Sequence, residues 1–354
     1  MKTVPPRVWN ETHLSHSSSL RVLETPCPSL NAMIAVLAGG VGAARFARGL
    51  IRAVSPSDVS IVVNTGDDTQ LHGLHISPDI DTVMYTLSNS IDQEKGWGLS
   101  GETWRAMSAL ERFADVRPKS SSAGTTWFNL GDADLATHMY RTARLHEGAT
   151  LQEITDEIRR AFKVEAMIIP MTNDRVSTRV VLASHSPTQP DHTISFQEYF
   201  VKHRHELPVA QIDFDGITTA KCIALQQLID ADTVIVAPSN PIVSIGPIVS
   251  LPLVRETLIK RRESVVAISP IVAGAALKGP ADRMLTELGH DASVVGVARM
   301  YAPWCSTLVI DDADAHLAAD VEREGMKCVV TNTIMSSPDV AADLARVTLK
   351  AIES

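Results

Sequence analysis

The chain has 354 residues, 45% of them hydrophobic and 21% charged, which is enough to bury the core of one large domain or two modest ones. Its 32 lysines and arginines against 41 aspartates and glutamates give a net charge of −9, which argues against a nucleic-acid partner because such proteins usually carry a basic stripe. The four cysteines form no C-x-x-C pair, so we expect neither a disulfide scaffold nor a thiolate zinc site, and a reducing cytoplasm fits best. Since no run of about 18 consecutive apolar residues occurs, the sequence predicts no transmembrane helix.

The N-terminal residues 1–32 differ from the rest of the chain. They contain four prolines and a run of three serines, and they lack both a sustained period and the apolar stretch of a signal peptide. We therefore expect a disordered N-terminal extension, with regular structure from Met33 onward.

From Met33, short apolar runs alternate with amphipathic stretches. In chain order we expect a strand at Met33–Ala38, a helix at Gly42–Val54, a strand at Val59–Asn64, and helices at Glu102–Asp115, at Asp132–His146 and from Thr150, which forms a capping box with Glu153. Three strand-like runs, Val164–Pro170, Ser177–Ala183 and Thr193–Phe196, are expected to form a hairpin region.

From Thr219 the alternation resumes. Helices are expected at Thr219–Ile229, Leu253–Arg262 and Asp339–Ile352, and strands at Thr233–Ala237, Ser264–Ser269, Ser293–Val297, Thr307–Ile310 and Lys327–Thr331. This pattern predicts a Rossmann-like α/β fold, a doubly wound and mostly parallel sheet covered on both faces. Residues 33–95 and 216–354 would form its nucleotide-binding core, and 96–215 a mainly helical insertion with a small antiparallel piece.

A glycine turn, Gly39, Gly40 and Gly42, separates the first strand from the first helix. Such a turn brings backbone N–H groups to a phosphate at a helix N-terminus. The dinucleotide fingerprint is not met, because Arg45 occupies its last position and the second strand ends in Asn64 rather than an acidic residue. We interpret the turn as a phosphate or nucleotide cradle with Arg45 as a clamp and disfavour NAD, although a tight turn without a ligand stays open.

Four aspartates follow the second strand within fifteen residues. They are Asp67, Asp68, Asp79 and Asp81, the last two in a new element that Ser77 would cap and Pro78 would begin. Ligands of open α/β sheets bind beyond the carboxyl ends of the strands, and adjacent carboxylates there suit Mg²⁺. The alternative is that each aspartate is only a turn or cap residue.

Later loops add weaker signals. The proline-stiffened loop 238–248 follows the strand Thr233–Ala237, and in the next loop Lys278 could pair with a phosphate and Asp282 with a base or ribose. The plainer interpretation is that both loops are rigid turns and that Lys278 is a solvated side chain. Three tryptophans could stack on an aromatic ligand or pack in the core: Trp97, Trp104 and Trp127.

Together these motifs resemble the 2-phospho-L-lactate transferase family of deazaflavin coenzyme (F-420) biosynthesis. The matching segments, in family order, are LAGGVGAARF, VVNTGDDTQLHGLHISPDIDTVMYTL, GWGLSGETW, LGDADLATH, SNPIVSIGPI, KGPADRM and TNTIM. They run from about Met33 to the C-terminus, while residues 1–32 and a longer loop at 119–126 depart from the family pattern.

The resemblance implies a reaction. The terminal ribitol hydroxyl of the deazaflavin precursor Fo attacks the distal phosphorus of a guanosine diphosphate ester that carries a three-carbon acid, and GMP leaves. It also implies Mg²⁺, small-molecule substrates only and a homodimer. The sequence leaves open whether the acid is lactyl, enolpyruvyl or glyceryl, because they differ by a few atoms at one carbon.

Residue roles follow from the resemblance too. Asp67 would hold Mg²⁺ and orient the attacking hydroxyl, and Asp68 and Asp81 would be further metal ligands or Fo contacts. Asp132 would contact Fo. The remaining candidates are Gly39, Gly40, Gly42 and Arg45 for the diphosphate, and Asn240, Ser244, Lys278 and Asp282 for the guanosine side.

Two alternatives stay open. A group of gluconeogenesis regulators that bind UDP-sugars without transferase chemistry is similar at the glycine turn and aspartate pair, but there a Gly/Ser-rich stretch follows instead of Thr69–Gly73. An NAD-dependent oxidoreductase fits Arg45 and Asn64 less well.

Overall fold

The computed structural model describes residues 33–183, 192–277 and 279–353. The predicted N-terminal extension and the candidate phosphate ligand Lys278 therefore lie outside the described residues.

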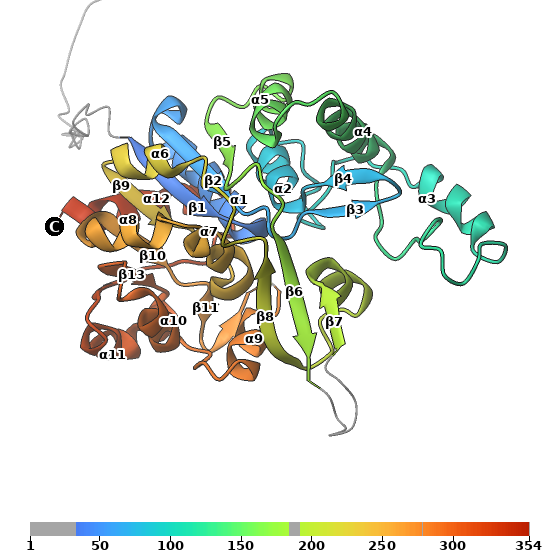
Figure 1. Ribbon diagram of the computed structural model, residues 1–354. Helices are drawn as coiled ribbons and strands as arrows, with labels where there is room; N and C mark the ends of the chain where they lie inside the picture. Colours follow the sequence, from blue (N-terminus) through green and yellow to red (C-terminus); the bar gives the residue numbers. More distant parts are fainter. Residues whose placement is uncertain (1–32, 184–191, 278, 354) are drawn as a thin grey trace, which may run out of the picture. The chain divides into compact units, whose positions relative to one another are not determined.

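Seven parallel strands form the central sheet, in the order β14-β13-β10-β9-β1-β2-β5 (Figure 1). Their bounds are β1 Ile34–Ala38, β2 Val59–Val63, β5 Met167–Pro170, β9 Thr233–Val236, β10 Val265–Ile268, β13 Thr307–Ile310 and β14 Lys327–Val330. The strand order reverses between β1 and β9, which makes this pair the topological switch point of a doubly wound sheet. The predicted Rossmann-like α/β fold is confirmed.

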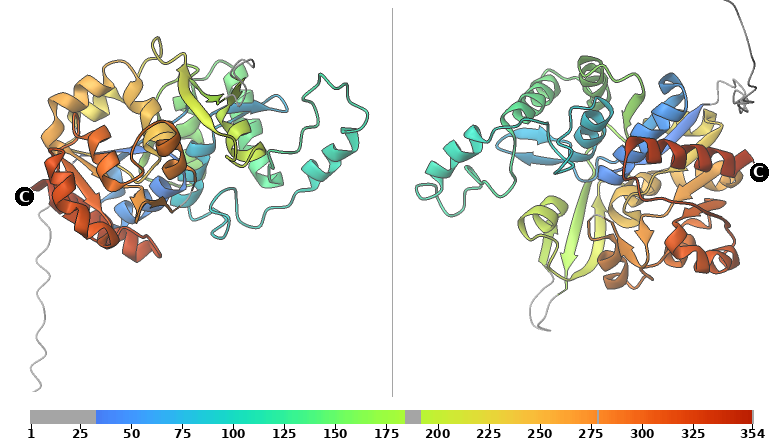
Figure 2. Two further views of the ribbon diagram at one scale, coloured as in Figure 1. Left: turned by 90° about the horizontal axis from the view of Figure 1, so that it is seen from below. Right: turned by 180° about the vertical axis from the view of Figure 1, so that it is seen from behind.

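Alternate residues of each central strand enter opposite cores. In β1, Val36 packs into the core on one face and Leu37 into the core on the other, both fully buried. One face is covered by α1 Gly40–Ala53, α2 Pro78–Leu87, α5 Leu151–Ala161 and α12 Pro338–Glu353. The other is covered by α6 Leu225–Asp230, α7 Gly246–Ser250, α8 Val254–Lys260, α9 Ala281–Glu287, α10 Val294–Tyr301 and α11 Ala318–Arg323. The view from behind shows α12 lying along α1 (Figure 2).

Smaller elements lie beyond the carboxyl edge of the central sheet. They are the hairpin β3 Thr69–Leu71 and β4 Leu74–Ile76, the antiparallel sheet β7-β6-β8 (His192–Ser195, Ser177–Leu182 and Val209–Asp215), the short pair β11 Ile271–Val272 and β12 Ala275–Ala276, and the helices α3 Arg105–Leu110 and α4 Asp132–His146. The capping box at Thr150 is formed, with the Thr150 hydroxyl accepting from the Glu153 N–H.

Three sequence predictions were wrong in whole or in part. The helix expected at Thr219–Ile229 begins only at Leu225, the first residue of α6, and residues 219–224 form turns and an isolated bridge. The run Val164–Pro170 does not belong to a hairpin, because β5 pairs in parallel with β2 and extends the central sheet. Ser293–Val297 is not a strand but the start of α10, where the Ser293 hydroxyl accepts a hydrogen bond from the Gly296 N–H at 3.2 Å. The valines of this run suggested a strand, whereas the serine cap and burial of the helix face favour a helix.

Within the described ranges, no single helix has the length and apolar content needed to cross a membrane. The segments Pro241–Ser250 and Val254–Lys260 meet that test only jointly, as a pair bent by 91°.

Candidate functional site

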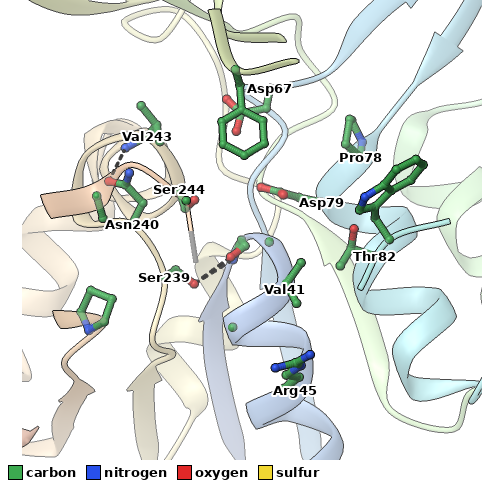
Figure 3. A pocket seen from close by; sticks show the side chains of 18 of the residues that line it. Val41, Arg45, Asp67, Pro78, Asp79, Thr82, Ser239, Asn240, Val243 and Ser244 are labelled. Atoms are coloured by element: carbon green, nitrogen blue, oxygen red, sulfur yellow. Dashed lines mark hydrogen bonds between the residues drawn. The ribbon is translucent and has the colours of Figure 1, made fainter. Parts of the chain in front are cut away.

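A cavity of about 810 Å³ opens at the carboxyl ends of β1 and β9. Ligand sites of doubly wound sheets form at this switch point, and the volume lies within the range of small-molecule pockets. Figure 3 shows the glycine turn below the cavity, Asp67 and Asp79 on one side, and Asn240 and Ser244 opposite.

The glycine turn packs against the loop that follows β9. The Gly39 N–H donates to the Ser239 Oγ at 3.3 Å, and the Ser239 hydroxyl donates to the Gly39 carbonyl at 2.9 Å. A Cβ on Gly39 would lie 2.7 Å from the Ser244 Cβ, and one on Gly42 would lie 2.3 Å from the Pro238 carbonyl oxygen. The turn therefore needs glycine for this close approach of two backbone segments.

Asn64, at the end of β2, joins three segments around the cavity. Its Nδ2 donates to Asp79 Oδ2 at 2.9 Å and to the Val243 carbonyl at 3.3 Å, and its Oδ1 accepts from the Gly66 N–H at 2.8 Å. Burial raises the pKa of Asp79 to about 6, although the hydrogen bond from Asn64 opposes the shift.

Asp67 faces the same space from the loop after β2 and is only 5% exposed. Burial raises its pKa well above the usual range, and the neighbouring charge of Asp79 adds to that shift. Its Oδ1 has no hydrogen-bond partner among the described residues, while its backbone carbonyl accepts from Gln197 Nε2 at 3.1 Å. An unpartnered buried carboxylate oxygen beside a second carboxylate fits a hard divalent cation such as Mg²⁺.

The other two candidate metal ligands both contact protein groups, although Asp68 Oδ1, like Asp67 Oδ1, has no hydrogen-bond partner among the described residues. Asp68 Oδ2 accepts from the Ser77 hydroxyl at 2.7 Å and lies 3.0 Å from His75 Nε2, and Asp68 does not line the cavity. Ser77 precedes Pro78 at the start of α2 as predicted, but its hydroxyl donates to Asp68 and does not cap the helix N-terminus. Asp81 does line the cavity, yet both its carboxylate oxygens accept from the guanidinium of the fully buried Arg141.

A further carboxylate, the half-buried Asp134, lies on α4. Its Oδ1 accepts from the Tyr85 hydroxyl at 2.6 Å, and its Oδ2 lies 3.4 Å from His138 Nε2. Burial works against ionisation, but the neighbouring His138, the hydrogen bond from Tyr85 and the charge of Arg141 outweigh it and lower the pKa of Asp134. The cavity thus holds two kinds of carboxylate, Asp67 and Asp79 with raised pKa values and Asp134 with a lowered one.

Eight predicted site residues line the cavity, three do not, and Lys278 is not described. The lining residues are Gly39, Gly40, Gly42, Arg45, Asp67, Asp81, Asn240 and Ser244. Asp68, Asp132 and Asp282 do not line it. Asp132 instead accepts hydrogen bonds from the N–H groups of Arg105 and Ala106, at 3.1 and 3.0 Å, and so caps the N-terminus of α3.

Asp79, Asp134 and His138 also line the cavity, although the sequence pattern assigned none of them a role in the site. The spacing of Asp134, His138 and Arg141 was an available signal, because positions i, i+4 and i+7 share one face of a helix.

Aromatic side chains form another part of the lining. Trp97, Trp127 and Phe128 line the cavity together with Phe196 and Phe200, whose rings stack at 5.5 Å. Trp104 does not line it but lies edge-on to Trp97 at 6.1 Å. These rings offer flat apolar surface for a planar ligand.

The fold and the cavity define a doubly wound α/β protein with a ligand-sized pocket at the switch point. The family model described as 2-phospho-L-lactate transferase CofD matches residues 34–349. The chain belongs to this transferase family, as the resemblance of its motifs implied.

Similar proteins are named phosphoenolpyruvate transferase. One from Kitasatospora aureofaciens is 38% identical over 324 residues, which cover 90% of this chain and 98% of the relative. Another from Mycobacterium tuberculosis H37Rv is 37% identical over 328 residues, which cover 88% and 96%. A solved structure of a UPF0052 family member from Bacillus halodurans shares the fold, with a TM-score of 0.54 at 12% identity over 90% of this chain and 98% of that one.

Proposed function

We propose that this chain acts in deazaflavin coenzyme biosynthesis, transferring a phospho-three-carbon-acid group from its guanosine diphosphate ester to the terminal ribitol hydroxyl of Fo. The hydroxyl oxygen forms a bond to the distal phosphorus, and the bond from that phosphorus to the GMP oxygen breaks with its electron pair leaving on GMP. The hydroxyl proton passes to a carboxylate. We propose phosphoenolpyruvate as the source of the acid, because the two relatives above carry that name.

The observation that carries this proposal is the buried pair Asp67 and Asp79, which faces the glycine turn in a chain of this family. A carboxylate whose pKa is raised by burial accepts a proton more readily than an ordinary aspartate, so Asp67 suits the attacking hydroxyl. Arg45 lines the cavity and makes no hydrogen bond or ion pair within the described ranges, so its guanidinium is free for the diphosphate.

Asp67 and Asp79 are the residues that would hold Mg²⁺. When bound, the cation neutralises phosphate charge, which phosphoryl transfer requires more than covalent help. The apolar rings of Trp97 and Trp127 suit the deazaflavin, and Asn240 and Ser244 suit the guanosine side.

The test is a transfer assay followed by mass spectrometry. The protein is incubated with Fo, Mg²⁺ and each of the lactyl, enolpyruvyl and glyceryl esters of guanosine diphosphate, with Asp67→Asn as the inactive comparison. We expect a phosphodiester adduct of Fo and an equal amount of GMP, formed fastest from the enolpyruvyl ester. Absence of any adduct, from folded protein that GDP with Mg²⁺ still stabilises thermally, would overturn the proposal.

The resemblance also implies a cytoplasmic homodimer, which we include in the proposal. Light scattering of the purified protein tests the dimer, and a mass equal to one chain would contradict it.

A further inference from the structure

Five buried or half-buried polar groups form a continuous network beside the proposed transfer centre. Arg141 binds both oxygens of Asp81 and lies 3.2 Å from His138 Nδ1, and His138 Nε2 faces Asp134, which also accepts from Tyr85. Four of the five line the cavity. The fifth, Arg141, is fully buried behind the cavity wall and contacts Asp81 and His138. The proposed chemistry at Asp67 and Asp79 leaves this network without a role.

The network places Tyr85 and His138 against the carboxylate of Asp134. A guanidinium only donates, so His138 Nδ1 accepts from Arg141. His138 Nε2 then faces Asp134 Oδ2 at 3.4 Å, and it has no hydrogen-bond partner among the described residues. Tyr85 donates to the other oxygen at 2.6 Å. An ionised carboxylate has about four lone-pair sites, so acceptor capacity remains, and the side chain keeps 13% of its surface exposed to the cavity.

We infer that Asp134, oriented by Tyr85 and His138, accepts hydrogen bonds from hydroxyl groups on the polyol chain of the acceptor. This inference rests on the proposed function and adds an acceptor-binding residue to it. A carboxylate repels the phosphates of the donor but binds neutral hydroxyl groups. Because the proposed guanosine side, with its ribose hydroxyls, is at Asn240 and Ser244, the acceptor chain is the part of the two substrates that Asp134 recognises. Tyr85 and His138 act through Asp134 and are positioning residues.

A cation does not suit this cluster. Asp81, Asp134 and His138 could bring ligand atoms within 4.8 Å of one another, but the guanidinium of Arg141 already lies against Asp81 and His138. A metal ion would meet that positive charge, whereas a hydroxyl group would not.

The test compares two acceptors by fluorescence titration of the deazaflavin without donor. One is Fo, and the other is a deazaflavin that carries an alkyl chain without hydroxyls. The variants are Asp134→Asn, Tyr85→Phe and His138→Gln. Matched controls are Tyr140→Phe on α4, where the hydroxyl donates to the carboxylate of Glu157 on α5, and Asp156→Asn on α5.

We expect the wild-type protein to prefer Fo by about 10- to 100-fold, because hydrogen bonds to a charged group are strong. Asp134→Asn should lose most of that preference through weaker binding of Fo, and the positioning variants part of it, while both controls keep it. In turnover, KM for Fo should rise and KM for the guanosine ester should stay within about twofold.

The outcomes separate the inference from the proposed function. If Asp134→Asn keeps the wild-type preference, or the wild type binds both acceptors equally while still forming the adduct, the inference alone is wrong. If the wild type neither binds Fo nor forms an adduct, the proposed function is wrong and the inference falls with it.

Discussion

Asn64 Nδ2 donates a hydrogen bond to Asp79 Oδ2 at 2.9 Å, and this bond joins the end of β2 to the first turn of α2. Through its other contacts Asn64 also holds the carbonyl of Val243 and the N–H of Gly66. One amide side chain thus sets the distance between the loop that carries Asp67 and the loop opposite it.

Replacing this amide by a carboxylate tests that role. Asn64→Asp would bring a third carboxylate against Asp79 and Asp67 and would remove the donor that Asp79 accepts from. We expect a loss of about 2–4 kcal/mol in the free energy of unfolding near neutral pH, measured with urea, and a smaller loss in acid where the carboxylates are protonated. The matched change Asn173→Asp, at an exposed amide that accepts from the Gln152 N–H, should cost little. Equal losses at both pH values would contradict the electrostatic explanation.

The raised pKa of Asp79 predicts a pH dependence of stability. Its pKa is about 6 in the folded protein, against about 4 in an unfolded chain. The folded protein therefore binds the proton of this carboxyl more tightly, so the contribution of Asp79 to the free energy of unfolding is largest below about pH 4 and is lost as the pH rises through about 6. The variant Asp79→Asn has no carboxyl to titrate at this position. Between about pH 4 and pH 6 its free energy of unfolding should therefore rise, relative to that of the wild type, by about 3 kcal/mol.

The measurement is urea unfolding of both proteins from acid to neutral pH without divalent cations. The informative quantity is the difference between variant and wild type, because other groups titrate in both. A difference that does not change with pH would show that the carboxyl of Asp79 is not perturbed.

Gly42 should not tolerate alanine, because its Cβ would lie 2.3 Å from the Pro238 carbonyl oxygen. The glycine turn would have to move away from the loop after β9, at a cost of about 1–3 kcal/mol. We expect KM for the guanosine ester to rise about tenfold or more, since the turn carries the proposed phosphate cradle. Gly289→Ala is the control. It adds a Cβ with no atom within 4 Å at a φ of +78°, so it should cost stability of similar size without changing KM.

Arg45 is predicted to bind the donor diphosphate. Arg45→Gln keeps a polar side chain of similar length but removes the charge, so KM for the guanosine ester should rise about tenfold while KM for Fo changes little. Arg52→Gln, which removes an exposed cation paired with Asp339 near the end of the same helix, should leave both constants unchanged. A rise in KM for Fo alone would place the donor elsewhere in the cavity.

Much of the sheet could be predicted because local pattern and tertiary burial agree. Thr307–Ile310 is a strand at the predicted residues, since this buried run is rich in β-branched side chains and lies between two covered faces. Ser293–Val297 has the same kind of composition, but the helix that starts there is set by its packing, which a short apolar run does not reveal.

The candidate site was predictable where it depends on strand ends. Asp67 and Asn240 follow strands whose carboxyl ends meet at one edge, so parallel topology alone brings their loops together. The pairing of Asp81 with Arg141 was not predictable, because it joins two helices across sixty residues of chain. Asp132 and Asp134 look equivalent in the sequence, and only the orientation of α4 turns Asp134 toward the cavity.

The ion pair between Arg141 and Asp81 allows the metal hypothesis for Asp81 to be tested directly. If Asp81 pairs with Arg141, then Arg141→Met leaves a buried carboxylate unpaired and Asp81→Asn leaves a buried guanidinium unpaired. Each change should cost about 3–5 kcal/mol of unfolding free energy. The double variant Asp81→Leu with Arg141→Met should recover most of that loss, because a buried pair can often be replaced by apolar residues at little cost. If Asp81 is instead a Mg²⁺ ligand, Asp81→Asn should leave stability nearly unchanged and raise the Mg²⁺ concentration needed for half-maximal transfer. Urea unfolding together with a Mg²⁺ titration of activity decides between the two roles, and the bidentate contact with a fully buried guanidinium leads us to expect the first.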